Sequence, residues 1–555
     1  MKTKYIFISG GVISGIGKGI TAASISFLLQ SLGIRVTPVK CENYLNVDAG
    51  TINPIEHGDP FLCEDGTEAD MDLGTYEKFL DKNLGKRNFM TMGQIYQTVI
   101  DRERKFEYMG EDVEAIPHIT DEIHKRWDAA AKHDGAEVVV VELGGTAGEY
   151  QNVFYYEAAR ILSLRNPEDV VHIHVGYMPT PSHLGEPKTK PIQLSVRTLN
   201  SMGIQPDFIV ARSEKPMDKR RKDRFALFCN VHPEDVISAP DSEVIYEVPL
   251  ILKEQRLDIR IVQKLGLRKK EDMGQSWKTF VDRVKAVKKS GKKVKVAIIG
   301  KYFGTGEYQL RDSYAALIDA LHHASWANNV DVEMVWVDAE NVEKNGPEKY
   351  LRGNGIQGII VPIGWGERGS EGMIRAASFA RTEKIPYLGL CYGMQLATIA
   401  FARDVLGWKD ATSEENNKES KHPVIHLMPA QVEAMKRRAY GGTMRLGAWE
   451  AKVAKGTLAW ESYEKHNAFT NKDKGLTTER HRHRYEFNDE FVKEFEEKGF
   501  IISARSSVEN LTEIIELPRD QHPFYLGTQG HPEYKSRPLK PHPLFVDFIA
   551  AALKK

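Results

Sequence analysis

Short apolar runs alternate with longer amphipathic stretches through the first half of the chain. The apolar runs lie at residues 5–8, 36–39, 138–142, 171–175, 208–210 and 236–238. Runs of this length, separated by helical stretches, are typical of a parallel sheet that is covered by helices. The pattern therefore predicts an α/β domain with a doubly wound parallel sheet over residues 1–266.

The pattern changes after residue 266. Residues 267–293 are rich in Lys and Arg and contain one amphipathic stretch that begins at Trp277, which predicts a helical linker. Apolar runs resume at residues 294–300 and return at 358–362, 386–390 and 523–528. We therefore expect residues 294–555 to form a second α/β domain, also with a doubly wound parallel sheet.

Composition narrows the class of protein. Of the 555 residues, 41% are hydrophobic and 28% are charged, and the net charge is -1. This balance gives no bulk attraction to nucleic acid or to a membrane surface, and no run approaches the ~20 apolar residues of a membrane span. The four cysteines have no metal-ligand spacing, which favours a reducing compartment. We expect a cytoplasmic protein that binds neither nucleic acid nor membrane.

The most specific chemical signal surrounds Cys391. The apolar run 386–390 leads into a Gly-x-Cys-x-Gly turn, and residues 396–402 predict the helix that follows. Flanking glycines permit the sharp strand-to-helix turn that exposes a nucleophile, and a helix N-terminus favours the thiolate. A lone cysteine is more often a buried structural residue, but His531 and Glu533 supply a base and an orienting carboxylate after another apolar run.

The turn Gly-x-Cys-x-Gly-Met-Gln, combined with a distant His-Pro-Glu, resembles the class I glutamine amidotransferases. The resemblance implies that Cys391 attacks the amide of glutamine, that His531 transfers the proton and that Glu533 orients His531. Such a domain hydrolyses glutamine through a thioester and releases ammonia, so another part of the chain is expected to use the ammonia.

A second candidate site lies at the N-terminal end of the chain. The first apolar run leads into a glycine-rich loop, residues 10–17, which is followed by Lys18 and a helical stretch from Thr21. Backbone N–H groups, the helix dipole and a lysine together favour phosphate. We therefore expect a P-loop-like phosphate site, with Lys18 acting directly on the reacting phosphate.

The loop departs from the strict P-loop at the metal position. Five residues separate Gly11 from Gly17, one more than usual, and Gly19 replaces the Ser or Thr that binds the metal. A metal must therefore rely on other groups, for which Asp72 and Glu142 are the candidates. Either acid alone would be an ordinary solvated residue at a strand end. Beside a phosphate loop the two suit Mg²⁺, which takes few protein ligands and keeps phosphate and water.

Over nearly its whole length the chain resembles the CTP synthases. The segments that carry the resemblance are residues 10–20, 46–58, 64–74, 142–146, 188–193, 228–231, 441–447 and 480–486. The resemblance implies an N-terminal amidoligase domain that binds ATP and UTP, phosphorylates O4 of UTP and lets ammonia displace the phosphate, giving CTP. It also implies an internal passage for ammonia, a homotetramer, activation by GTP and inhibition by CTP.

Site residues follow from the same resemblance, position by position. Those implied for ATP are Gly15, Ile16, Gly17, Lys18, Gly19, Ile20, Lys40, Asp72, Arg212 and Asp241. Those implied for UTP or CTP are Ser14, Glu149, Tyr150, Gln151, Lys188, Thr189, Lys190, Pro191, Ile192, Gln193 and Arg224. Those implied for L-glutamine are Gly364, Tyr392, Gly393, Met394, Gln395, Glu415 and Arg484.

Four positions depart from the family pattern. Ile363 occupies a usual glycine position in the turn that helps form the oxyanion hole, and Gly530 replaces an aromatic residue before His-Pro-Glu. Gln151 stands where an acid is usual, and Arg224 stands where lysine is usual. Because a β-branched residue tolerates positive φ badly, Ile363 is expected to affect glutaminase efficiency.

Two other functions remain compatible with these patterns. One is a different glutamine-dependent ATP ligase that amidates a carboxylate, against which the segments 46–57 and 188–193 argue. The other is a catalytically weakened protein that acts mainly by assembly, which Ile363 and Gly530 would favour.

Overall fold

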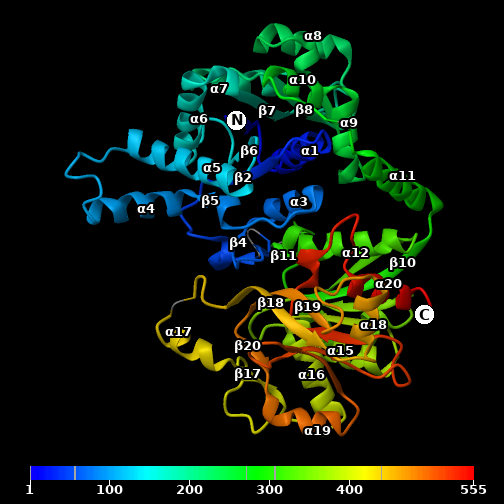
Figure 1. Ribbon diagram of the computed structural model, residues 1–555. Helices are drawn as coiled ribbons and strands as arrows, with labels where there is room; N and C mark the ends of the chain where they lie inside the picture. Colours follow the sequence, from blue (N-terminus) through cyan, green and yellow to red (C-terminus); the bar gives the residue numbers. More distant parts are fainter. Residues whose placement is uncertain (1, 55–57, 271, 306–307, 310, 439) are drawn as a thin grey trace. The chain divides into compact units, whose positions relative to one another are not determined.

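The computed structural model describes residues 2–54, 58–270, 272–305, 308–309, 311–438 and 440–555. The chain forms two compact units, each with its own main sheet (Figure 1). The first unit comprises Met1–Ala49 and Asp72–Asp282, and the second comprises Gly50–Met71 and Arg283–Lys555. The segment Gly50–Met71 thus packs with the second unit, although the hydrophobic pattern places it inside the N-terminal domain.

The main sheet of the first unit is entirely parallel. Its strands, in spatial order, are β5 (Phe89–Thr91), β2 (Val36–Glu42), β6 (Val138–Leu143), β1 (Lys4–Gly11), β7 (Val170–Tyr177), β8 (Phe208–Ser213) and β9 (Val236–Pro240). All six predicted runs lie in this sheet, and only the three-residue β5 was not predicted. Because the strands are parallel, their carboxyl ends meet at one edge, where α/β proteins bind ligands.

Helices cover both faces of this sheet (Figure 1). Phe7 of β1 packs against Trp127 of α5 with ring centroids 5.0 Å apart, while α1 packs against β1, β2 and β6. The helices are α1 (Lys18–Ser31), α3 (Met71–Leu80), α4 (Met92–Arg104), α5 (Thr120–Asp134), α6 (Val153–Arg165), α7 (Lys190–Ser201), α8 (Lys219–Cys229), α9 (Val248–Glu254), α10 (Leu257–Lys264) and α11 (Gln275–Ser290). The predicted linker helix is α11.

The main sheet of the second unit is mixed. Its parallel half contains β13 (Asp331–Asp338), β10 (Lys293–Gly300), β14 (Gly358–Val361), β15 (Tyr387–Leu390) and β23 (Tyr525–Thr528). An antiparallel half continues through β22 (Thr512–Glu516), β21 (Ile501–Ser506), β18 (Arg445–Val453) and β19 (Leu476–His483). The α/β class is confirmed, and the antiparallel extension is a feature that the sequence pattern did not predict.

Smaller elements complete the second unit. Residues 61–69 form a short hairpin of β3 (Phe61–Leu62) and β4 (Glu68–Ala69). A small sheet joins β16 (Thr412–Ser413), β17 (Pro423–Leu427) and β20 (Tyr485–Phe487), and β11 (Gly304–Thr305) pairs with β12 (Tyr308–Gln309). The helices are α12 (Ala315–Ala327), α13 (Ala339–Asn345), α14 (Glu348–Leu351), α15 (Ser370–Thr382), α16 (Tyr392–Asp404), α17 (Val432–Lys436), α18 (Leu458–Lys465), α19 (Val492–Glu496) and α20 (Pro543–Ala552).

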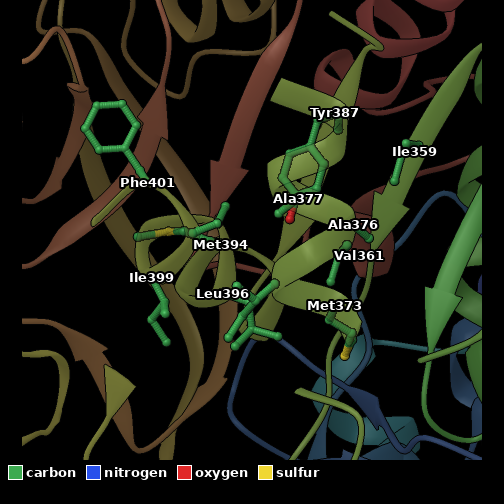
Figure 2. Packing of buried hydrophobic residues seen from close by; sticks show 14 of the residues in the cluster. Ile359, Val361, Met373, Ala376, Ala377, Tyr387, Met394, Leu396, Ile399 and Phe401 are labelled. Carbon is green, nitrogen blue, oxygen red and sulfur yellow. The ribbon is translucent and has the colours of Figure 1, made fainter. Parts of the chain in front are cut away.

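Helix α16, which follows the predicted nucleophile, is buried along almost its whole length. Figure 2 shows Met394, Leu396, Ile399 and Phe401 of this helix in the same hydrophobic cluster as residues of α15 and β14. Such close packing fixes the position of the helix and of the turn before it. Among the described helices, none is both long and apolar enough to cross a membrane.

Candidate active sites

Cys391 lies in a sharp turn between β15 and α16. Its backbone has φ 51° and ψ -99°, a conformation that L-residues rarely adopt. Two close contacts hold the turn: the Cys391 N–H donates to the carbonyl oxygen of Thr528 at 2.7 Å, and Gly393 leaves room for the carbonyl oxygen of Val361, which a Cβ would approach to 1.9 Å. The strained turn is therefore held by the strands on both sides of β15.

His531 and Glu533 form a buried pair. Nδ1 of His531 lies 2.7 Å from Oε1 of Glu533, which fixes the orientation of the ring. Burial lowers the pKa of His531, but the charges of Glu533 and Cys391 outweigh it and raise the pKa to about 10. The pair therefore favours an imidazolium beside the Cys391 sulfur.

Gln529, which the sequence analysis did not select, contacts the same sulfur. Its Nε2 lies 3.4 Å from Sγ of Cys391, and the thiol is 3.9 Å from the carbonyl oxygen of Arg482. A neutral amide has no sequence signature of its own, and its place in the site depends on the register of β15 and β23.

The turn that follows β14 faces the nucleophile helix. Nζ of Lys301 donates to the carbonyl oxygens of Trp365, at 3.0 Å, and Gly366, and it lies 4.4 Å from the ring centroid of Tyr392. Burial lowers the pKa of Lys301 to about 8. Lys301, also missed by the sequence analysis, thus ties the turn to the residue that follows Cys391.

Three of the residues expected to bind glutamine have side chains that already make hydrogen bonds within the protein. Glu415 accepts a hydrogen bond from the Gly366 N–H at 3.0 Å, and burial raises its pKa. Arg484 donates to Gln431, to the carbonyl oxygen of Tyr440 and to Thr443. The amide of Gln395 points into the protein, where it donates to the carbonyl oxygen of Tyr485 at 2.8 Å.

In the first unit, the glycine-rich loop connects β1 to α1. Nζ of Lys18 donates to the carbonyl oxygen of Gly145 at 2.6 Å, and burial lowers its pKa. A Cβ at Gly17 would lie 3.5 Å from Nε of Arg212, and Arg212 pairs with Asp241 at 2.9 Å. The structure therefore brings Lys18, Arg212 and Asp241 to the same loop.

A buried lysine gathers three carboxylates beside this loop. Nζ of Lys40 contacts Glu142 at 2.9 Å, Asp72 at 2.5 Å and Glu42 at 2.9 Å. Burial lowers the pKa of Lys40, but the three carboxylates outweigh it and raise the pKa well above its usual value; burial also raises the pKa of Glu142. Glu42 was not predicted.

The absence of a side chain at Gly19 leaves room for this cluster. A Cβ there would approach Oδ1 of Asp72 to 2.0 Å and Oε2 of Glu142 to 3.5 Å. Asp72 thus occupies the space that the Ser or Thr of a strict P-loop would fill. Within the described residues, no group of three or more His, Cys, Asp or Glu side chains could hold a metal ion.

The residues expected to bind the pyrimidine nucleotide come from two segments and two single positions. Glu149 follows β6 and accepts from the backbone N–H and hydroxyl of Thr146 at 2.9 and 2.5 Å, while Tyr150 and Gln151 beside it are exposed. Lys188, Thr189 and the residues after them lead from β7 into α7. Ser14 is exposed in the glycine-rich loop, and Arg224 is exposed on α8.

Comparison with known proteins identifies the chain. Residues 4–267 match the family profile described as CTP synthase N-terminus, and residues 309–551 match that described as glutamine amidotransferase class-I. A CTP synthase of Caldanaerobacter subterraneus is 46% identical, covering 99% of this chain and 98% of its own. The CTP synthase of Halalkalibacterium halodurans is 45% identical and covers 100% of this chain and 100% of its own. That of Pyrococcus abyssi is 46% identical and covers 99% of this chain and 98% of its own. The chain belongs to the CTP synthase family.

As a CTP synthase, the protein is a glutamine-hydrolysing carbon–nitrogen ligase. It converts UTP to CTP in pyrimidine nucleotide biosynthesis and uses ATP as a substrate. Among solved structures, the glutaminase domain of Trypanosoma brucei CTPS with bound acivicin is 35% identical, covers 47% of this chain and 94% of that one, and superposes with a TM-score of 0.42.

The structure accounts for two departures from the CTP synthase pattern. At Gly530, a Cβ would lie 2.8 Å from Cβ of Glu479 and 3.3 Å from Nε2 of His481, so β19 occupies the space of an aromatic side chain. Ile363 is not among the described residues with positive φ, and its side chain is buried in the core. The expected conflict between a β-branched residue and positive φ therefore does not arise.

Proposed function

We propose that the two reacting centres divide the work of the CTP synthase between the two units. The convergence of Lys18, Lys40, Asp72 and Glu142 at one edge of a parallel sheet carries this proposal for the synthetase half. The buried His531–Glu533 pair beside Cys391 supports it for the glutaminase half. Ammonia made at Cys391 would then be consumed at the edge of the first sheet.

In the glutaminase half, His531 takes the thiol proton from Cys391, and the thiolate attacks the amide carbon of glutamine. The imidazolium returns its proton to the departing nitrogen, so that ammonia leaves and a thioester remains. Water, deprotonated by the neutral His531, then releases glutamate and restores the thiol. Glu533 holds the ring throughout and stabilises its charged form.

In the synthetase half, phosphorylation of UTP at O4 turns a poor leaving group into a good one. Phosphoryl transfer requires positioning and neutralisation of charge above all, which Lys18 and Lys40 can supply. Asp72 and Glu142 would hold Mg²⁺, which when bound supplies additional positive charge to the phosphates. The carbonyl of Gly145 orients Lys18, and ammonia then displaces the phosphate at C4.

The finer assignments belong to the same proposal. Arg212 and Asp241 would lie near the adenine, Glu149 to Gln151 and Lys188 to Gln193 would hold the pyrimidine nucleotide, and Glu415 and Arg484 would bind the ammonium and carboxylate groups of glutamine. We also propose a cytoplasmic homotetramer that is activated by GTP and inhibited by CTP, as the family resemblance implies.

The decisive experiment is CTP formation by Cys391→Ala with glutamine and with ammonium as nitrogen sources. The variant is expected to lose glutamine-dependent synthesis and to retain synthesis from ammonium. Cys229→Ala, at a buried cysteine of α8, is the matched control and should retain both activities. Loss of both activities in folded Cys391→Ala would refute the division of labour, and a wild-type protein without glutaminase activity would favour the assembly function.

A further inference from the structure

The end of β23 is attached to the nucleophile turn through its backbone. Leu390 of β15 is in register with Thr528 of β23, and the Cys391 N–H donates to the Thr528 carbonyl at 2.7 Å. On the other side, the Gln529 N–H donates to the carbonyl oxygen of Glu513 at 2.8 Å. Gln529 is 1% exposed, so its side chain meets protein atoms rather than solvent.

Three hydrogen bonds in series fix the direction of the Gln529 amide. Gln395 donates from Nε2 both to the carbonyl oxygen of Tyr485, at 2.8 Å, and to Oε1 of Gln529, at 3.1 Å. The Tyr485 carbonyl can only accept, so the NH₂ group of Gln395 must face it. Because that NH₂ group also occupies Oε1 of Gln529, the NH₂ group of Gln529 must face Sγ of Cys391, 3.4 Å away.

We propose that Gln529 is a further catalytic residue of the glutaminase, whose amide stabilises the Cys391 sulfur as an anion. Gln395 is then a positioning residue that holds the Gln529 amide with its donor toward the sulfur. A neutral donor suits this role, because it stabilises the thiolate without taking the proton and leaves that transfer to His531. Hydrogen bonds to a charged group are the stronger kind, and burial strengthens them further.

The same bond acts at two steps of the reaction. Before attack, it raises the fraction of thiolate that is available. In thioester hydrolysis, the C–S bond breaks, the sulfur keeps the electron pair and leaves as thiolate, and the Gln529 amide receives it. Loss of the donor should therefore lower kcat rather than raise KM, because the amide contacts the reacting sulfur and not the bound amino acid.

The test compares Gln529→Glu, which keeps the shape and replaces the donor with an acceptor, with Gln529→Leu, which removes the polar group. We expect glutaminase kcat to fall about 10- to 100-fold with KM changed less than about threefold. Alkylation of Cys391 by iodoacetamide should shift to higher pH, by more in Gln529→Glu than in Gln529→Leu. Ammonium-dependent CTP synthesis should remain, and Gln521→Glu, at an exposed glutamine of the same unit, should match the wild type.

Gln395→Met keeps the proposal testable if the variants at Gln529 do not fold. It frees the Gln529 amide without touching the sulfur, so the alkylation profile should shift in the same direction even though no glutamine is present. Unchanged kcat and superimposable alkylation profiles in the folded variants would overturn the proposal. The inference rests on the proposed role of Cys391, and different results would refute the two claims. Full glutaminase activity in Cys391→Ala would refute the role of Cys391, whereas unchanged variants at Gln529 would refute only the role of Gln529.

Discussion

The hydroxyl of Tyr314 bridges Lys301 and Ile363. It accepts a hydrogen bond from the Lys301 N–H and donates one to the Ile363 carbonyl oxygen, each at 3.3 Å. Ile363 is 2% exposed and packs in the same cluster as Leu388 and Leu390 of β15. The residue that replaces the usual glycine is thus held through its backbone by the hydrogen bond from Tyr314, and through its side chain by burial in this cluster.

Replacing Ile363 by glycine is therefore expected to cost stability without improving catalysis. Loss of a buried Ile side chain typically costs about 2–5 kcal/mol, and glycine adds about 1 kcal/mol of backbone entropy. We expect a lower unfolding free energy of the second unit in denaturant titrations, with glutaminase kcat in the surviving folded protein changed less than about threefold. Ile363→Val is the control, and it should lower the unfolding free energy by about 1 kcal/mol. A large gain in glutaminase activity would show instead that the natural residue impairs the site.

The Glu533 carboxylate should set the alkaline limit of glutaminase activity. The charges of Glu533 and Cys391 raise the pKa of His531 to about 10, so the imidazolium that protonates the departing ammonia persists to high pH. Glu533→Gln removes one of these charges and should move the alkaline limb of the kcat profile down by about one pH unit or more. Glu509→Gln, at a carboxylate that pairs with Arg445, should leave the limb in place.

The sign of the stability effect follows from the same shift. A histidine whose folded pKa lies above its unfolded value of about 6.5 stabilises the protein fully below pH 6.5, and this contribution is lost as the pH rises toward 10. The unfolding free energy of the wild type should therefore fall more steeply between pH 7 and 10 than that of Glu533→Gln. Parallel curves would contradict the assignment of the raised pKa to Glu533.

Asp72 provides the test of the cation site. Asp72→Asn keeps the shape and removes the charge next to Lys40, so CTP formation from either nitrogen source should fall at least ~100-fold, with glutaminase activity retained. The residual activity should need more Mg²⁺, because one carboxylate ligand is gone. Asp223→Asn, on the exposed face of α8, is the matched control. Near-normal turnover with ammonium in Asp72→Asn would refute the metal assignment.

Gln151 provides the test of product feedback. A carboxylate at this exposed position would accept a charge-assisted hydrogen bond from the 4-amino group of CTP, whereas the amide brings no charge. We expect CTP to inhibit Gln151→Glu several-fold more strongly than the wild type, on the order of 1 kcal/mol. Inhibition against UTP measures this, with Gln97→Glu on α4 as a charge-matched control. Equal inhibition constants would mean that residue 151 does not contact the base.

Local signals predicted much of this molecule. The six apolar runs of the first half all became strands of one sheet, because a parallel strand is buried on both faces and therefore reads as a continuous apolar run. The position of Cys391 between β15 and α16 could also be predicted, because the glycines that permit its turn are close to it in the sequence.

The antiparallel half of the second sheet could not be predicted from apolar runs. In β19, residues 479–483 are Glu-Arg-His-Arg-His and all are buried. Their charges are satisfied by partners far along the chain, such as Glu68 for Arg482. Apolar periodicity cannot reveal a strand of this kind, because burial is achieved by pairing rather than by side-chain type. Gln529 and Lys301 were missed because their contacts exist only once the strands are in register.

The packing of Gly50–Met71 with the second unit has a consequence for chimeric enzymes. Arg482 pairs with Glu68 at 2.6 Å, and Arg480 donates to the Leu62 carbonyl oxygen at 2.8 Å. Both arginines belong to β19, so the glutaminase half binds this segment through buried side chains. The chain enters and leaves that half there before returning to it after Asp282. A chimera that takes only residues 283–555 from one enzyme would lack the segment 50–71 of that enzyme and would have to pack against the segment 50–71 of the other enzyme. Exchange of glutaminase halves between relatives should therefore carry residues 50–71 along with residues 283–555.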